Sequence, residues 1–169
     1  MEIKTEDRAK YKAKKDQNSA KSENEILQQA KAILKSRIQQ TGANLSSPED
    51  VAEYMALKNH KETQKTEIFT TLYFNSNNEI LIESETTGTI DKSPVYTREI
   101  ARKALENNAT AVIIAHNHPS GTTIPSQADI TVTKKIKDAL RLLDITLTDH
   151  VIYSPDGEKY CSFVEKCLM

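Results

Sequence analysis

The chain has 169 residues, of which 37% are hydrophobic and 28% are charged, and its formal net charge is −1. This size and composition predict one domain with a sizeable core and a polar extension. The near-zero net charge gives no basic field that would attract nucleic acid, and no apolar run is long enough to span a bilayer. Because the two cysteines do not make a disulfide framework and no secretory signal is recognisable, we expect a cytoplasmic protein.

The N-terminal part of the chain is polar. Residues 1–22 are rich in lysine, with five basic residues and no acid at 8–15. They have no apolar stripe to bury, which predicts a disordered, solvated tail; a basic arm for nucleic acid is the alternative. Ser22 and Glu25 then form a capping-box pattern, and the apolar residues behind it recur at helical spacing. We therefore predict an N-terminal helix within 23–44.

Residues 45–169 combine helical and strand patterns in an order typical of an α/β domain. In chain order we predict a helix at 47–58, a hairpin of strands at 67–75 and 79–87, a helix beginning at 97 and ending before 107, a buried strand at 110–115, a helix from 126 to about 143, and strands at 145–153 and 160–164. The helix from 126 is expected to bury Ile130, Ile136, Leu140 and Leu143. This order predicts a single mixed β-sheet flanked by helices.

Two histidines directly follow the predicted buried strand at 110–115. His116 and His118 are two residues apart, a spacing that sends both side chains to the same side of an extended backbone. Asp129 follows His118 by eleven residues, in the first turn after the predicted helix cap Ser126. Two imidazoles and a carboxylate are a common ligand set for catalytic zinc, with the fourth position left to water. An acid also stabilises a helix N-terminus without any metal, so the assignment of Asp129 depends on the two histidines.

The string HNHPSG at 116–121, followed by PSQAD at 125–129, resembles the JAMM (JAB1/MPN/Mov34) metalloprotease motif, in particular that of its RadC-like branch. Further similarities to that family are found at 67–75, 88–89, 98–99, 111–116 and 149–150. The resemblance covers about residues 45–167. It implies a JAB/MPN domain with a curved mixed sheet between helices, in the arrangement of cytidine deaminases.

The resemblance also implies roles for single residues. It implies that His116, His118 and Asp129 bind one Zn²⁺ per chain, that Glu67 is the general base, and that Ser126 stabilises the oxyanion. The residues alone leave the base open among five acids, which are Glu62, Glu67, Glu79, Glu83 and Glu85. They also leave Ser126 with two duties, because a serine before a helix is a common N-cap.

The other histidines, Ser120 and the two cysteines are not predicted to be metal ligands or catalytic residues. His60 is expected in an exposed connector, and Ser120 is not the nucleophile, because a serine–histidine pair would leave the metal ligand set unexplained. His150 is expected to be a structural histidine, with the orientation of a metal ligand as the alternative. A zinc deaminase is disfavoured, because neither Cys161 nor Cys167 lies in the cysteine pattern of those enzymes.

The sequence therefore predicts a zinc-dependent metallohydrolase that cleaves a peptide or isopeptide bond through an activated water. Its expected partner is a peptide or protein substrate of unknown identity; ubiquitin, nucleic acid and a membrane are not supported. The alternative is a non-enzymatic zinc-binding module in a DNA-repair or mobile-element complex.

Overall fold

The structure is a computed structural model in which two units are distinguished, Met1–Arg37 and Ile38–Met169. In the larger unit it describes residues 45, 47–59, 65–87 and 97–169. In the smaller unit it describes five residues, all in helical conformation, which are Glu25, Ile26, Gln29, Ala30 and Ile33. The predicted tail at 1–22, most of the predicted helix at 23–44, and both His60 and Glu62 lie outside the described residues.

The larger unit is an α/β structure built on one five-stranded mixed sheet, as the sequence predicts. Its elements are α2 (Pro48–Lys58), β1 (Ile68–Phe74), β2 (Ile80–Thr87), α3 (Thr97–Glu106), β3 (Ala111–Asn117), α4 (Gln127–Arg141), β4 (Thr146–Tyr153) and β5 (Tyr160–Ser162). The strands are ordered β2-β1-β3-β4-β5. The β3–β4 pair is parallel and the other three neighbouring pairs are antiparallel. The parallel pair is joined by α4, which makes β3-α4-β4 a crossover unit.

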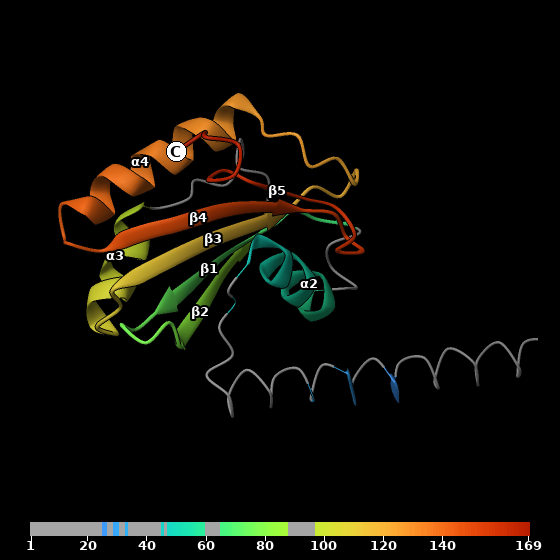
Figure 1. Cartoon of the computed structure of the whole chain (residues 1–169), viewed down its shortest axis with the longest axis horizontal. Helices are drawn as coiled ribbons and strands as arrows, with labels where there is room; N and C mark the ends of the chain where they lie inside the picture. The colour runs from blue at the N-terminus through green and yellow to red at the C-terminus, as the bar shows by residue number, and fades with distance from the viewer. Residues whose placement is uncertain are drawn as a thin grey trace, which may run out of the picture. The chain divides into compact units, whose positions relative to one another are not determined.

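Helices cover both faces of this sheet, α2 on one face and α3 with α4 on the other (Figure 1). Side chains of β3 alternate between the two layers, as strand geometry requires. Val112 and Ile114 pack in the core beneath α3 and α4, whereas Ile113 and Ala115 pack in the core beneath α2. Continued alternation places His116 on the α4 face of the sheet.

α2 and α4 each begin with a capping box. Ser47 Oγ accepts a hydrogen bond from Asp50 N at 3.1 Å, and Asp50 Oδ2 accepts one from Ser47 N at 2.9 Å. Pro48 occupies the first turn, where its missing N–H costs nothing. At α4 Ser126 and Asp129 form the same capping box. The start of each helix is thus fixed by a serine that exchanges two hydrogen bonds with the acid three residues later.

The structure corrects two details of the predicted elements. α4 ends at Arg141, and Leu143 is exposed, so the predicted buried stripe is wrong at that position, whereas Ile130 is half-buried and packs against a core cluster. The buried residues of α4 are Asp129, Thr133, Ile136 and Leu140. The buried side of α4 differs from the predicted one because two polar residues near the start of the helix, Asp129 and Thr133, are buried where the sequence predicts apolar residues. The second correction is at β3, which continues beyond 115 and includes His116 and Asn117.

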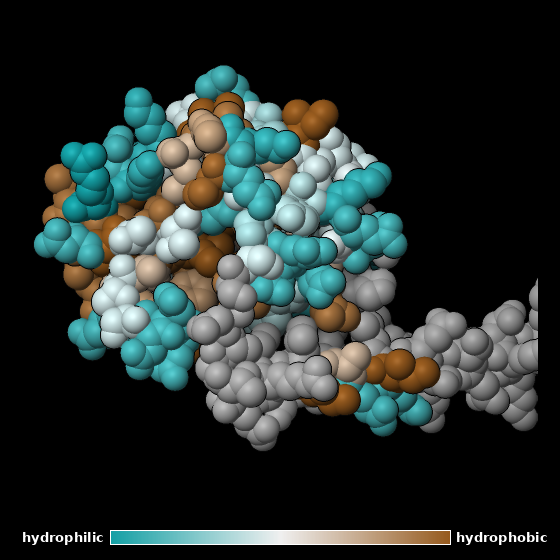
Figure 2. Space-filling model, viewed as in Figure 1, coloured by the Kyte–Doolittle hydropathy of each residue, from teal (hydrophilic) through white to brown (hydrophobic). Residues whose placement is uncertain are grey.

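The surface seen in Figure 2 is largely hydrophilic, with smaller apolar areas between the polar side chains. Ile124 and Leu142 are among the exposed large hydrophobic residues. Scattered apolar residues of this kind are normal on protein surfaces and do not by themselves define a docking face. Among the described helices, none has the length and apolar character needed to cross a membrane.

Candidate metal centre

The predicted metal ligands come together at the carboxyl end of β3, where the chain leaves the sheet and then enters α4. His116 is the penultimate residue of β3, His118 follows that strand directly, and Asp129 lies in the first turn of α4. In a β-α-β unit the helix begins near the carboxyl end of the first strand, so the three residues meet at that end of the strand. Ligand sites of open α/β sheets lie at the carboxyl ends of the strands.

The atoms that face one another in this cluster are two imidazole nitrogens and two carboxylate oxygens. His116 Nε2 lies 3.0 Å from His118 Nε2 and 3.3 Å from Asp129 Oδ1. His118 Nε2 lies 3.8 Å from Asp129 Oδ2. One ligand atom from each of the three residues lies within 4.8 Å of the others, so the cluster can hold a metal ion.

The ring nitrogens that turn away from the cluster determine which tautomer each histidine adopts. His118 Nδ1 is 3.0 Å from the Thr122 carbonyl oxygen, which only accepts, so this nitrogen carries the proton. His116 Nδ1 is 2.8 Å from His150 Nε2. The contact between His150 and Thr133 decides which of these two nitrogens carries the proton.

A buried chain of hydrogen bonds runs from α4 to His116. The Thr133 hydroxyl donates to the Asp129 carbonyl oxygen at 2.6 Å, and its oxygen lies 2.6 Å from His150 Nδ1. A hydroxyl has a single proton, so Thr133 accepts from His150 Nδ1–H. His150 Nε2 is then the acceptor, and His116 Nδ1–H donates to it. The chain therefore leaves His116 Nε2 unprotonated and directed at the cluster.

Burial keeps the inner histidines neutral. Both His116 and His150 are fully buried. Desolvation lowers the pKa of the His116 imidazole, although the Asp129 carboxylate opposes the shift, and it lowers the pKa of His150 as well. Metal binding needs neutral imidazole, so these residues require no deprotonation at neutral pH.

The two carboxylate oxygens of Asp129 contact different partners, the N-terminus of α4 and the His116 imidazole. Its Oδ2 accepts from Ser126 N at 2.7 Å in the capping box, while Oδ1 is the oxygen nearest His116 Nε2. The carboxylate therefore stabilises the N-terminus of α4 and also contributes to the cluster. Ser126 is exposed, and its Oγ accepts from Asp129 N at 3.1 Å, which shows the capping duty predicted for it.

The three residues fit a metal ion chemically. Two unprotonated imidazole nitrogens at 3.0 Å repel each other unless a cation lies between them. In a tetrahedral zinc site with metal–ligand distances of about 2.0–2.2 Å, neighbouring ligand atoms are about 3.3–3.6 Å apart. The separations of 3.0 to 3.8 Å found here bracket that range. Three protein ligands also leave one position open, as in catalytic sites.

Glu67 lies one residue before β1 and is half-buried. Phe69 pairs with His116 across the antiparallel β1–β3 ladder. This is the last pair of the ladder at this end, and Glu67 and His118 both lie just beyond it. Because Phe69 belongs to the core on the α4 face, alternation places position 67 on that face, with the metal cluster.

Three of the other acids named as alternatives have partners elsewhere. Glu83 accepts from Tyr54 and Lys58 of α2, on the opposite face of the sheet, and Glu85 pairs with the same lysine. Glu79 accepts from Asn75 in the β1–β2 turn.

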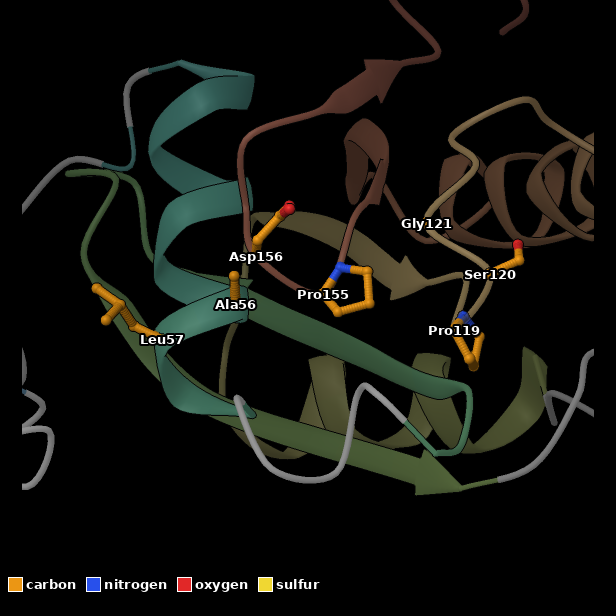
Figure 3. A pocket seen from close by; sticks show the side chains of 7 residues that line it. All are labelled: Ala56, Leu57, Pro119, Ser120, Gly121, Pro155 and Asp156. Atoms are coloured by element: carbon orange, nitrogen blue, oxygen red, sulfur yellow. The ribbon is translucent and has the colours of Figure 1, made fainter. Parts of the chain in front are cut away.

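A pocket of about 380 Å³ lies beside the loop that follows His118. Figure 3 shows α2 on one side of the pocket, the loop that contains Pro119, Ser120 and Gly121 on the other, and the turn between β4 and β5 between them. The residues that line it are Ala56, Leu57, Pro119, Ser120, Gly121, Pro155 and Asp156. The metal cluster does not line it, so the pocket is a neighbouring hollow rather than the metal centre itself.

The structure is an α/β domain in which a cluster that could hold a metal ion lies at the end of a parallel strand pair. The chain belongs to the family of RadC-like JAB domains, whose model matches residues 45–168. This match confirms the resemblance predicted from the motif.

Several proteins of the UPF0758 group are similar to this chain. One from Pseudoalteromonas translucida is 42% identical over 146 residues, which are 85% of this chain and 62% of that protein. One from Vibrio cholerae is 40% identical over 145 residues, covering 85% of this chain and 88% of the other. The protein YkfG of Escherichia coli is 39% identical over 145 residues, covering 85% and 89%. These names state no activity, so they support the family and not a reaction.

Proposed function

We propose that this protein is a zinc-dependent hydrolase that cleaves a peptide or isopeptide bond. The observation that carries the proposal is the convergence of His116 Nε2, His118 Nε2 and an Asp129 oxygen, with both imidazole tautomers set for ligation. This ligand set, with its open fourth position, is that of catalytic rather than structural zinc sites. When bound, zinc supplies a Lewis acid that polarises a carbonyl and lowers the pKa of a water molecule.

The roles of the chain's own groups follow from their positions. Glu67, which strand alternation from Phe69 places on the same face of the sheet as the metal ligands, accepts a proton from the attacking water. It then returns that proton to the nitrogen of the leaving amine, so that the carboxylate is regenerated. Glu83 and Glu85 contact α2 on the opposite face of the sheet and Glu79 contacts the β1–β2 turn, so these three acids lie away from the metal ligands.

Ser126 is proposed to stabilise negative charge on the carbonyl oxygen as water adds to the carbonyl carbon. Its Oγ accepts from Asp129 N, and that bond does not use the hydroxyl proton. The same side chain can therefore cap α4 and donate to a developing oxyanion. A fixed donor of this kind acts where charge develops in the reaction, which is why one hydroxyl contributes measurably.

The substrate is proposed to be a peptide or protein segment that reaches the open edge of the sheet. The hollow beside Pro119 gives room for a side chain of such a segment next to the metal centre. We place the reaction in a reducing compartment, the cytoplasm, in keeping with the two free thiols Cys161 and Cys167.

The test is cleavage of a peptide library by the zinc-loaded protein, with new termini identified by mass spectrometry. We expect cleavage by the wild type and none by the His116→Ala/His118→Ala double variant or after removal of zinc by a chelator. Cleavage that survives the loss of both histidines would contradict the proposal. Zinc binding without cleavage of any peptide or of folded isopeptide substrates would favour the non-enzymatic module instead.

A further inference from the structure

Asn117 lies between the two histidine ligands in sequence, but its side chain belongs to the other face of the sheet. It is the last residue of β3 and is fully buried. Its amide contacts a segment about fifty residues earlier in the chain. Ile68 N–H donates to Asn117 Oδ1 at 2.8 Å, and Asn117 Nδ2 donates to the Thr66 carbonyl oxygen at 3.0 Å.

These two hydrogen bonds hold the peptide groups on either side of Glu67. The Thr66 carbonyl belongs to the peptide plane that precedes the Glu67 Cα atom, and the Ile68 N–H belongs to the plane that follows it. Because peptide groups are planar, a residue has two free backbone dihedrals, φ and ψ. Fixing both neighbouring planes fixes both dihedrals of Glu67, and with them the direction of its Cα–Cβ bond.

The Asn117 side-chain amide forms hydrogen bonds just beyond the end of the backbone ladder between β1 and β3. The last paired residues of the β1–β3 ladder at this end are Phe69 and His116. Beyond them, Asn117 presents the same donor and acceptor groups as a peptide unit and continues the hydrogen bonding to the segment before β1. The middle residue of the His-Asn-His sequence thus connects the metal ligands to the acid proposed as base.

We propose that Asn117 is a positioning residue that sets the direction of Glu67 toward the metal centre. This inference rests on the proposed function, in which Glu67 is the general base. Placement matters for such a group, since a displacement of about 1 Å can lower a rate on the order of 10²-fold. The unbranched carboxylate side chain of a glutamate has several rotatable bonds, so a fixed starting direction narrows the positions that its oxygens reach.

Asn59 provides the matched control. It is also a buried asparagine, and its Nδ2 donates to the Tyr153 hydroxyl at 3.5 Å, at the end of α2. Its replacement by alanine removes a buried amide of the same size without touching the peptide planes around Glu67. Effects that come only from a lost buried amide should therefore appear in Asn59→Ala as well as in Asn117→Ala.

The first test is backbone ¹⁵N relaxation of the zinc-loaded protein. In the wild type we expect rigid amides at Glu67 and Ile68, with order parameters of about 0.85, falling below about 0.6 in Asn117→Ala but not in Asn59→Ala. Zinc content should stay that of the wild type, because no ligand is removed. Unchanged order at both amides in Asn117→Ala would overturn the proposal. If the alanine variant does not fold, Asn117→Leu keeps the volume and lacks both hydrogen bonds.

The second test is kinetic and uses the peptide that the wild type cleaves. Asn117→Ala should lower kcat about 10- to 100-fold with KM nearly unchanged. In a Glu67→Gln background the same substitution should have no further effect, because the group that it positions is already absent. Losses that multiply in the double variant would show that Asn117 acts through another group. Full activity of Glu67→Gln would refute the proposed base, while the relaxation result would still decide whether Asn117 orders this segment.

Discussion

His150 Nε2 lies 2.8 Å from His116 Nδ1, and both rings are fully buried. The His150 ring is packed against Phe163, with ring centroids 4.4 Å apart, and it meets the edge of Phe69. Packing therefore fixes the ring, and Thr133 fixes its tautomer. His150 is thus an orienting partner of a candidate metal ligand, the alternative to a purely structural role that the sequence leaves open.

Thr133→Val should weaken metal binding while leaving the fold intact. Valine has the shape of threonine but gives His150 Nδ1–H no acceptor, so the tautomer of His150, and through it that of His116, is no longer fixed. Loss of such an outer partner typically costs about 10- to 100-fold in metal affinity. Thr133→Ser keeps the hydroxyl and should stay near the wild type. Competition with a chromophoric chelator measures both, and equal affinities for the valine and serine variants would contradict the chain of hydrogen bonds.

Glu67→Gln and Asp129→Asn should differ in metal content although both lose hydrolysis. Asp129→Asn removes the charged oxygen that lies 3.3 Å from His116 Nε2, so bound zinc should fall. Glu67→Gln removes the proposed base and no ligand, so zinc should remain while the rate falls on the order of 10²–10⁴-fold. Elemental analysis together with circular dichroism compares the two. Loss of zinc from Glu67→Gln would mean that this acid is a ligand.

Gly157→Ala should destabilise the domain more than Gly121→Ala. Both glycines have positive φ, +79° and +77°, so alanine carries the left-handed penalty of about 1–2 kcal/mol at either site. A Cβ at Gly157 would in addition lie 2.9 Å from the Ala56 Cβ of α2, whereas one at Gly121 would meet nothing within 4 Å. The close contact should add about 1–3 kcal/mol. Urea unfolding of the two variants gives the difference, and equal midpoints would show that the turn moves freely away from α2.

Ser47→Ala should lower the free energy of unfolding by about 1 kcal/mol, since Ser47 Oγ accepts from Asp50 N at the start of α2. Ser47→Asn retains a cap and should lose much less. The ligand cluster is built by β3 and α4, so metal content should not change in either variant. A loss above about 3 kcal/mol would show that Ser47 does more than cap the helix.

The candidate ligands are predictable from sequence because their spacing reflects local geometry. His116 and His118 share a side through strand alternation, and the Ser126 cap places Asp129 in the first turn of its helix. The motif therefore reveals three residues whose relative positions are set by short stretches of chain.

The outer partners are not predictable in this way. Thr133 reaches His150 only because α4 packs on β4, and Asn117 reaches Thr66 and Ile68 only through sheet register. The polar buried face of α4 explains the wrong prediction at Leu143 as well: hydrophobic periodicity assigns apolar residues to the core and overlooks Asp129 and Thr133. A threonine two turns before the helix end, or an asparagine between two histidines, carries no local signal of its contacts.

The zinc content of the purified protein after dialysis against a weak chelator tests the metal centre most directly. We expect about one zinc per chain in the wild type, because one ligand atom from each of three residues lies within 4.8 Å of the others. We expect the loss of that zinc in the His116→Ala/His118→Ala variant, with the fold retained by circular dichroism. Stoichiometric zinc in the double variant, or a folded wild type that binds none when zinc is supplied, would contradict the assignment of the metal centre.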